Sequence, residues 1–274
     1  TTFTVDLEFI DRWVLPLLGR AAVRSVVILC DDTQLADHLI IPASSRAGRA
    51  YHVGTVPCAG VFHPKLIHLT REDRQVACVS SANLTAAGQL RNLETAVVLD
   101  SEDETHRSAL AQINQFERQL AESQPEHITE ALFDLITETT EPIDPDAAVQ
   151  FLHNLNRPII SQLPDGPINA IAPFASPNAA ETLHDRNGLD LYLDHRSPDL
   201  TAGLIAGAWN LSTVRFIDQH GEPVERHLHG KAIWNNSADW CLVGSPNLTQ
   251  SALLATRQNG NIEAAVLIRD LDSF

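Results

Sequence analysis

Apolar and polar positions along this chain follow two different periods. From Leu7 to Leu18 apolar residues recur every three or four positions, the spacing of one face of a helix. Ser25–Leu29 is instead a short continuous apolar run, which is typical of a buried strand. By the same criteria we expect, in the first half of the chain, further strands at Arg49–Val56, Val61–Leu69, Gln75–Ser80 and Leu93–Leu99. We expect further helices from a cap at Asp32 or Thr33 through Ile40, after the loop Ser81–Thr85 to Leu90, and at Glu104–Glu122 and Thr129–Thr139.

The second half repeats this order of elements after a Pro- and Asp-rich segment, Glu141–Pro145, which we take as the boundary. The chain therefore predicts two similar α/β/α lobes with mixed sheets, residues 1–140 and 141–274, as an internal duplication rather than a solenoid. The pattern predicts strands at Ile168–Pro173, Leu189–Leu193, Thr213–Ile217, Arg226–Trp234, Trp240–Val243 and Ile262–Ile268, and helices at Asn178–His184, Leu200–Trp209 and Leu248–Ala255.

A motif occurs once in each half. Each copy contains His-x-Lys, then a small-residue loop with Asn-Leu-Thr, then Asn-x-Glu. The only two lysines of the chain, Lys65 and Lys231, stand in these motifs, while every other basic residue is arginine. A compact ammonium is therefore needed at both positions, because a planar guanidinium is not an equivalent donor. The copies are His63-Pro64-Lys65, Ser80-Ser81-Ala82-Asn83-Leu84-Thr85 and Asn92-Leu93-Glu94, then His229-Gly230-Lys231, Gly244-Ser245-Pro246-Asn247-Leu248-Thr249 and Asn261-Ile262-Glu263.

The residue types of this motif suit phosphate chemistry. If the His-x-Lys segments are strands, His63 and Lys65 share one face, and so do His229 and Lys231. A loop carrying Asn before a helix adds an amide and free backbone N–H groups. Two such half-sites facing each other could hold one phosphodiester and attack it without a metal, one imidazole as nucleophile and the other as acid. The two histidines must then hold different protonation states at neutral pH, and Glu94 and Glu263 are the candidate carboxylates that could arrange this by contacting Nδ1.

Composition narrows the cellular setting. The net charge of −16 argues against a broad basic nucleic-acid footprint, although arginines near the motifs are compatible with a local positive cleft. The four cysteines have no paired or zinc-like spacing, which indicates free thiols in a reducing compartment, and we expect a cytoplasmic protein. No apolar run has the length of a membrane span, and no signal peptide is recognisable. The chain starts with Thr and contains no Met, so we expect it to be part of a longer protein.

The doubled His-x-Lys…Asn pattern resembles the phospholipase D superfamily. That family's longer motif has an acidic residue five places after the Lys, where this chain has Thr70 and Asn236. The resulting His-Lys-Asn form is closer to the tyrosyl-DNA phosphodiesterases and to some phospholipase D-like nucleases. The resemblance covers both halves, with the specific residues confined to about 30 in each.

The resemblance implies a site at the interface of two α/β/α lobes. We expect the protein to need no cofactor. The resemblance assigns His63 as nucleophile and His229 as general acid and base, and it implies that the carboxylate of one motif supports the histidine of the other. Glu94 would then pair with His229, and Glu263 with His63. Phosphate ligands would be Lys65, Lys231, Asn83 and Asn247. We add as substrate-binding candidates Ser81, Ser245, Thr85, Thr249 and His227, the last because it lies on the His229 face of the predicted strand.

Several interpretations stay open. The leading one is a DNA nuclease module of a larger bacterial protein, with further domains or subunits as partners. A restriction or defence role is suggested by what members of the resembled family commonly do. The alternatives are a phospholipase D or phosphatidyltransferase acting on lipid, and a catalytically inactive binding lobe. A zinc site from His227, His229 and Cys241 lacks a fourth ligand. Asp73 and Asp239 fit turns, and Pro64 in a central strand would require a bulge or an unpaired amide.

Overall fold

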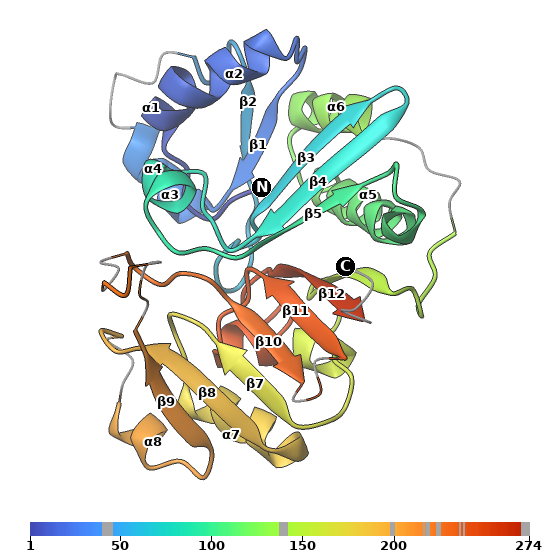
Figure 1. Cartoon of the computed structure of the whole chain (residues 1–274). Coiled ribbons are helices and arrows are strands. Elements are labelled where there is room, and N and C mark those ends of the chain that lie inside the picture. The colour runs from blue at the N-terminus through green and yellow to red at the C-terminus, as the bar shows by residue number, and fades with distance from the viewer. Residues whose placement is uncertain are drawn as a thin grey trace.

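The computed structural model of this chain contains both helices and strands in each half (Figure 1). It describes residues 1–39, 46–136, 142–197, 201–215, 217, 220–222, 226–235, 237 and 239–269. Below, the N-terminal half means residues 1–136 and the C-terminal half residues 142–269.

The N-terminal half begins with a helical segment over the predicted positions. It consists of α1 (Leu7–Phe9), a π-helical turn η1 (Ile10–Val14) and α2 (Leu15–Arg20). Asp6 caps this segment, because its carboxylate accepts the Phe9 N–H at 2.9 Å. The parallel strands β1 (Val27–Cys30) and β2 (His52–Thr55) follow, with α3 (Asp32–Leu39) between them.

The predicted cap of α3 was wrong by one residue. Asp31, rather than Asp32 or Thr33, accepts the Thr33 N–H at 3.0 Å. The predicted helix end at Ile40 lies outside the described residues.

Three antiparallel strands complete the N-terminal half. They are β3 (Leu66–Arg71), β4 (Arg74–Ser80) and β5 (Ala96–Asp100), with α4 (Ala86–Leu90) between β4 and β5. The first two residues connect this sheet to β1, because Thr2 donates to Leu29 O at 2.9 Å and Leu66 donates to Thr1 O at 3.1 Å. A 3-10 turn, η2 (Glu104–His106), then leads into α5 (Arg107–Ala121) and α6 (Glu126–Leu135).

The C-terminal half is built on one mixed sheet of seven strands in the order β6-β12-β11-β10-β7-β8-β9. Strands β7, β8 and β9 are parallel, and the other neighbours are antiparallel. The strands are β6 (Val149–His153), β7 (Ile168–Ile171), β8 (Leu189–Asp194), β9 (Asn210–Val214), β10 (Ala232–Asn235), β11 (Trp240–Gly244) and β12 (Ala264–Arg269). The helical elements are η3 (Ile159–Gln162), α7 (Pro177–Asn187), α8 (Ala202–Ile205) and the π-helical turn η4 (Gln250–Leu254).

The sequence pattern misplaced some of these elements. It missed β6, whose polar Gln150 and His153 interrupt the apolar run. It placed β9 three residues late and made α8 too long, and Leu200 lies outside the described residues. It also ended α6 at Thr139, which is likewise outside them; in the described part the helix ends at Leu135.

A shared apolar core joins the two halves. One cluster combines residues of β4, β5 and α5 with residues of β6 and β12, for example Phe116 and Phe151, whose ring centroids are 5.4 Å apart. Each large side chain buried there contributes roughly 1.5–3 kcal/mol. Two further clusters lie one in each half. The shared core fixes how the half-sites described below face each other.

Candidate active site

Each half of the chain lends a backbone segment to the motif of the other half. Phe62 and Ile262 form an isolated parallel bridge, with His63 N donating to Ile262 O at 2.9 Å. Leu93 and Leu228 form the equivalent bridge, with His229 N donating to Leu93 O at 2.9 Å. Each Asn-x-Glu segment therefore runs beside the His-x-Lys segment of the opposite half.

This exchange corrects the prediction that the two His-x-Lys segments are strand residues. The strand predicted at Val61–Leu69 begins only at Leu66, and the one predicted at Arg226–Trp234 begins only at Ala232. The reason is that the amides of His63 and His229 are used by the opposite half rather than by a neighbouring strand. Pro64 therefore needs no bulge, since it precedes the strand.

The predicted pairing of carboxylates and histidines across the halves is confirmed. His63 Nδ1 lies 2.8 Å from Glu263 Oε2, and His229 Nδ1 lies 2.9 Å from Glu94 Oε2. An ionised carboxylate only accepts, so each Nδ1 carries the proton and the lone pair of each ring is on Nε2. That tautomer leaves Nε2 as the nucleophilic or proton-accepting atom.

Each carboxylate is held by two more side chains of its own half. Ser81 donates to Glu94 Oε2, and Ser245 donates to Glu263 Oε2. Asn92 Nδ2 lies 3.1 Å from Glu94 Oε1, and Asn261 Nδ2 lies 3.0 Å from Glu263 Oε1. The structure therefore gives Ser81 and Ser245, predicted as substrate contacts, a different role: they orient the carboxylates.

Both lysines are buried beside their histidines. Lys65 and Lys231 are each 2% exposed, and each Nζ donates to the backbone oxygen of the histidine two residues earlier. The Phe3 ring lies 5.3 Å from the His63 ring and 5.7 Å from Lys65 Nζ. His63 and Lys65 thus lie on the same side of their segment, as predicted, although residues 63–65 are not part of a strand.

Burial controls the protonation of these groups. It lowers the pKa of His63 to about 4, helped by the nearby lysines and opposed by Glu263. Burial also lowers the pKa of His229. His63 is consequently a neutral imidazole at pH 7, and a bound anion would raise the pKa of both rings.

Burial also lowers the pKa values of the two motif lysines. Burial lowers the pKa of Lys231 to about 7 and that of Lys65 well below its usual value, with Lys231 adding repulsion at Lys65. Burial pushes the pKa of Glu94 and Glu263 upward, but their hydrogen-bonded partners hold both below the ordinary value. Two ammonium groups with depressed pKa values would be stabilised by an anion bound between them.

The two asparagines of the motif lie in matching loops but differ in their partners. Asn83 Oδ1 accepts the Thr4 N–H at 3.4 Å, next to Phe3, which contacts His63. Asn247 Oδ1 is buried without a hydrogen-bond partner among the described residues. A buried amide oxygen without a partner is costly, so this loop has capacity for a donor group.

The remaining predicted substrate contacts lie at the edge of this arrangement. Thr85 accepts the Gly88 N–H at 3.1 Å and so caps α4. Thr249 precedes η4, and its hydroxyl lies 3.3 Å from Ser251 Oγ. His227 is exposed, with its ring centroid 6.2 Å from that of His229. Of these three residues His227 is the one that is exposed, whereas Thr85 and Thr249 are half-buried.

Two buried aspartates support the site and escaped the sequence interpretation. Asp31 accepts the Phe62 N–H at 2.7 Å, and Asp194 accepts the Leu228 N–H at 3.4 Å. Each therefore holds the residue immediately before a motif histidine. Asp31 directly follows the apolar strand β1, and Asp194 is the last residue of β8. These matching positions in the two halves were a signal in the repeat that could have revealed both aspartates.

Asn154, in the C-terminal half, is a third supporting residue. It is fully buried; Oδ1 accepts the Glu263 N–H at 2.7 Å, and Nδ2 donates to Ala255 O and Asn261 O. Because Asn154 follows β6, which the sequence pattern missed, no repeat signal pointed to it.

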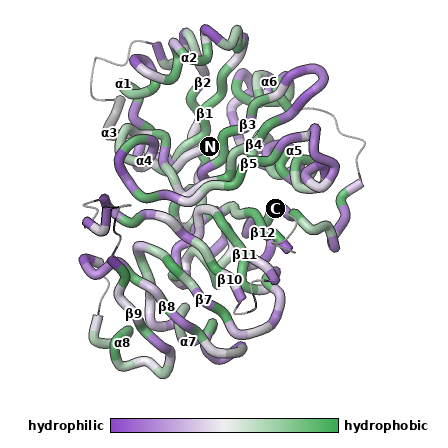
Figure 2. The backbone as a smooth tube through the Cα atoms, viewed as in Figure 1, coloured by the Kyte–Doolittle hydropathy of each residue, from purple (hydrophilic) through white to green (hydrophobic). Residues whose placement is uncertain are grey.

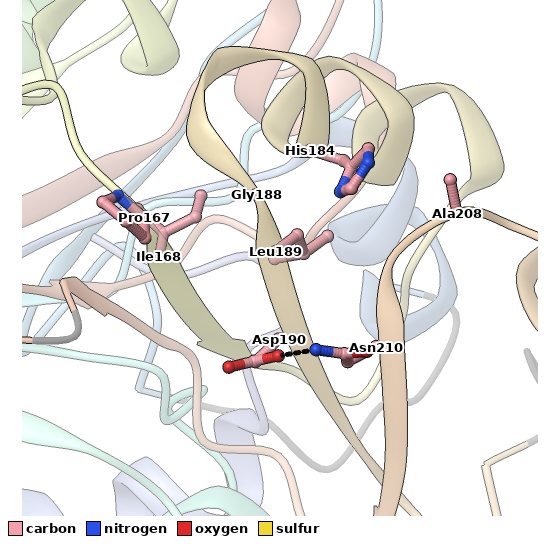
Figure 3. A pocket seen from close by; sticks show the side chains of 8 residues that line it. All are labelled: Pro167, Ile168, His184, Gly188, Leu189, Asp190, Ala208 and Asn210. Atoms are coloured by element: carbon pink, nitrogen blue, oxygen red, sulfur yellow. Dashed lines mark hydrogen bonds between the residues drawn. The ribbon is translucent and has the colours of Figure 1, made fainter.

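The hollow drawn in Figure 3 does not coincide with this site. Among the described residues no group of three or more His, Cys, Asp or Glu side chains is placed to hold a metal ion. The hollow in Figure 3 is lined by Ile168, Leu189 and Asn210, the first residues of β7, β8 and β9. The motif residues lie at the opposite end of these strands, since Lys231 precedes Ala232, which pairs with Ile171. Buried hydrogen-bonded histidines and lysines define the site better than concavity does.

Comparison with known proteins supports the fold. The sequence matches no protein-family model and no curated protein. The structure of yeast tyrosyl-DNA phosphodiesterase matches 100% of this chain and 82% of its own, with a TM-score of 0.61 and 12% identity. A histidine-to-alanine mutant of that yeast enzyme matches 98% of this chain and 81% of its own, with a TM-score of 0.60 and 13% identity.

A second enzyme shares the fold more distantly. Polyphosphate kinase from Porphyromonas gingivalis matches 100% of this chain with a TM-score of 0.51 and 13% identity, although this chain spans only 43% of the kinase. At these identities the similarity establishes the fold. The chain has the phospholipase D-like α/β fold, as the doubled motif predicted.

Proposed function

We propose that this protein is a metal-independent phosphodiesterase that cleaves nucleic acid through a phosphohistidine intermediate. The exchange of carboxylates between the halves carries the proposal: each histidine is oriented by a glutamate of the other half, at 2.8 and 2.9 Å. Two oriented imidazoles and two buried ammonium groups match the needs of a double displacement at phosphorus.

In the first step His63 Nε2 attacks phosphorus. Its pKa near 4 keeps the ring unprotonated, and Glu263 stabilises the cationic ring that forms. The leaving oxygen departs with the bond electrons and takes a proton from His229 Nε2–H, whose pKa the bound phosphodiester raises. Lys65 and Lys231 stabilise the charge on the equatorial oxygens.

In the second step water cleaves the phosphorus–nitrogen bond. His229, now neutral, accepts a proton from the water, whose oxygen bonds to phosphorus, and the bond electrons return to His63 Nε2. The product is a phosphate monoester, and both rings regain their starting protonation. Glu94 supports the cationic His229 at the start and the end of the cycle.

Exposed arginines beside the site favour a nucleic acid as substrate. Arg226 Nε donates to Arg91 O at 2.7 Å, and Arg196 Nη2 donates to Arg226 O at 2.7 Å while also pairing with Asp194 at 3.0 Å, so the three arginines lie side by side next to His227. Such a rim can contact successive phosphates although the chain carries a net charge of −16. A single phosphatidyl headgroup offers one phosphate. None of the helices in the described part of the chain is long and apolar enough to span a bilayer.

Parallel incubation with labelled DNA, labelled RNA and phosphatidylcholine vesicles tests this function, each with excess chelator. We expect cleavage of DNA, with RNA and lipid weaker, and no loss of rate in chelator. Cleavage of phosphatidylcholine alone would support the lipid alternative, and DNA binding without cleavage would support an inactive binding lobe. Activity abolished by chelator and restored by magnesium would contradict the metal-free mechanism.

A role as a nuclease module in bacterial restriction or defence is part of this proposal. The DNA arm of the same experiment tests the restriction role, because a restriction nuclease cuts DNA. The division of the chain near residue 140 likewise stays a prediction.

A further inference from the structure

The first residues of the chain run beside the first motif and are fixed there by backbone contacts. Val5 forms a parallel bridge with Leu84, and the Leu84 N–H donates to the Thr2 hydroxyl at 2.9 Å. Phe3 O accepts the Asp31 N–H at 3.4 Å. Figure 2 shows this end of the chain, marked N, between the β1–β2 pair and β3. The backbone is therefore held on both sides of Phe3, which fixes the position of its ring.

The Phe3 ring lies against the histidine and the lysine of this motif. Its centroid is 5.3 Å from that of the His63 ring and 5.7 Å from Lys65 Nζ. A cation within about 6 Å of an aromatic face is attracted to it, and more strongly where water is excluded. Of the three N–H groups of the buried Lys65 ammonium, one has an acceptor in the described part of the chain, His63 O at 2.7 Å. The ring and this oxygen together hold the ammonium, and further N–H groups stay available for a ligand.

The equivalent position in the C-terminal half is a proline. The parallel bridge between Ala175 and Leu248 corresponds to the bridge that the first residues of the chain form in the other half. Pro173 stands two places before Ala175, in the position of Phe3. From this position the first motif lysine therefore receives an aromatic contact and the second does not. The ring thus belongs to the half-site that contains the proposed nucleophile, His63.

The charges around Lys65 explain why a neutral ring suits this place. Burial lowers the pKa of Lys65 well below its usual value, repulsion from Lys231 adds to this, and Glu263 and Glu94 oppose it. The adjacent His63 ring is neutral at pH 7 because burial lowers its pKa to about 4. Both glutamates are already bonded to the motif histidines. A further carboxylate would neutralise the charge that a phosphate needs, whereas an aromatic face stabilises the ammonium and leaves its charge in place.

We propose that Phe3 is a positioning residue of the phosphate site: its ring holds the Lys65 ammonium in place and favours its charged form, which prepares this half-site for an anionic phosphodiester. Without the ring, burial and the second lysine would shift Lys65 towards the neutral amine, which does not attract phosphate oxygens as an ammonium does. The use of this contact rests on the proposed function, but the contact itself can be measured without turnover.

Titration of the lysines by NMR measures the contact. Because Lys65 and Lys231 are the only lysines of the chain, the whole protein labelled with carbon-13 at lysine Cε gives two signals, which Lys65→Arg assigns. Phe3→Leu keeps an apolar side chain but removes the ring, and it should lower the pKa of Lys65 by roughly half a pH unit or more. Phe3→Tyr should restore the parent titration. Phe133→Leu is the matched control: it removes a ring of α6 that lies 5.9 Å from the Arg118 guanidinium, and it should leave both titrations unchanged.

The pH dependence of kcat/KM on a nitrophenyl phosphodiester shows whether the reaction uses the contact. The high-pH limb, along which Lys65 loses its proton, should move to lower pH in Phe3→Leu by the shift that NMR measures. On that limb the rate should fall about threefold for each half pH unit of displacement. At lower pH, where Lys65 is protonated in both proteins, the rates should converge.

Thermal melting shows which variants fold, and Phe3→Met takes the place of Phe3→Leu if the latter does not. An unchanged Lys65 titration in Phe3→Leu, or a Phe3→Tyr protein that titrates like Phe3→Leu, would overturn the proposal. A loss of rate by the same factor at every pH would also overturn it, because the ring would then act by packing alone. A parent that turns over no phosphodiester would contradict the proposed function, while a lowered Lys65 pKa in Phe3→Leu would still support the contact.

Discussion

The two half-sites are alike in their contacts and unlike in their burial. In each, the carboxylate accepts from a histidine, a serine and an asparagine. The His63 side chain is 8% exposed against a fully buried Glu263, whereas His229 and Glu94 are 14% and 11% exposed. A double displacement needs one neutral and one protonated imidazole, and the more deeply buried ring is the better candidate for the neutral one.

This asymmetry predicts where a covalent adduct forms. In His229→Ala, His63 should still attack a nitrophenyl phosphodiester, whose leaving group needs no acid, but no base then activates water. A phosphohistidine should accumulate and be seen by intact mass at neutral or alkaline pH, with peptide mapping placing it on His63. His63→Ala should show none. An adduct on His229 in His63→Ala would reverse the assignment.

The lysines should not tolerate arginine. Lys65→Arg and Lys231→Arg keep the charge but put a larger, planar donor into space where each side chain is 2% exposed. We expect each to lose at least about tenfold in kcat/KM on the nitrophenyl substrate, or about 1.4 kcal/mol of transition-state stabilisation. Arg12→Lys, an exchange at an exposed ion pair with Glu8, is the control and should change nothing. Parent rates in both lysine variants would mean that the ammonium groups are incidental.

At the scale of elements, short loops between strand and helix fix the motif asparagines. Thr85 closes the Asn83 loop in two ways. Its hydroxyl caps α4, and its N–H donates to the backbone oxygen of Asn83 at 2.8 Å. Gly88 packs directly on this loop: a Cβ there would lie 2.4 Å from Asn83 O and 2.8 Å from Asn83 N. The helix thus holds the loop by backbone contact that leaves no room for a side chain.

Gly88→Ala should therefore displace Asn83 even though alanine is the better helix former. We expect a loss of roughly 1–3 kcal/mol in unfolding free energy and a rise in KM, measured by urea unfolding and steady-state kinetics. Gly19→Ala in α2 is the matched control, because nothing lies within 4 Å of its Cβ. It should be neutral or stabilising by up to about 1 kcal/mol. A Gly88→Ala protein as stable as Gly19→Ala would contradict the contact.

At the scale of the whole molecule, the site lies where the halves exchange backbone segments. Strands β4 and β5 share one apolar core with β6 and β12, so neither half-site can move without the other. The cost is that ionisable groups are buried together at the junction. Stability should therefore depend on pH through these groups.

The protein should lose stability as pH falls from 6.5 to 4. His63 and His153 have a folded pKa of about 4, lowered mainly by burial, against 6.5 when unfolded. In this window the unfolded chain binds the extra protons, so acidification favours unfolding, by up to about 3 kcal/mol for each histidine. Urea unfolding at pH 7 and pH 5 measures the loss, and His63→Asn should reduce it. A free energy of unfolding independent of pH over this range would contradict the burial argument.

The sequence by itself determined the duplicated fold and the identity of the central residues. Periodicity predicted most strands, because buried strands in both halves are continuous apolar runs. The doubled motif paired Glu94 with His229 and Glu263 with His63 through the family resemblance, and the contacts agree. The repeat was informative because two copies of one motif must satisfy the same chemistry.

Only the tertiary structure decided how the two copies are held together. His63 and Lys65 precede their strand because the amide of His63 bonds to Ile262, a partner 199 residues away (262 − 63) that no local pattern reveals. Asp31, Asp194 and Asn154 act through backbone amides, whose partners leave no trace in side-chain spacing. The rows Ile67–Cys78–Val98 on β3–β5 and Ile233–Leu242–Leu267 on β10–β12 are both apolar in sequence. Ile67 and Val98 are nevertheless exposed, whereas the second row is buried in a cluster that includes residues of η3, α7 and η4.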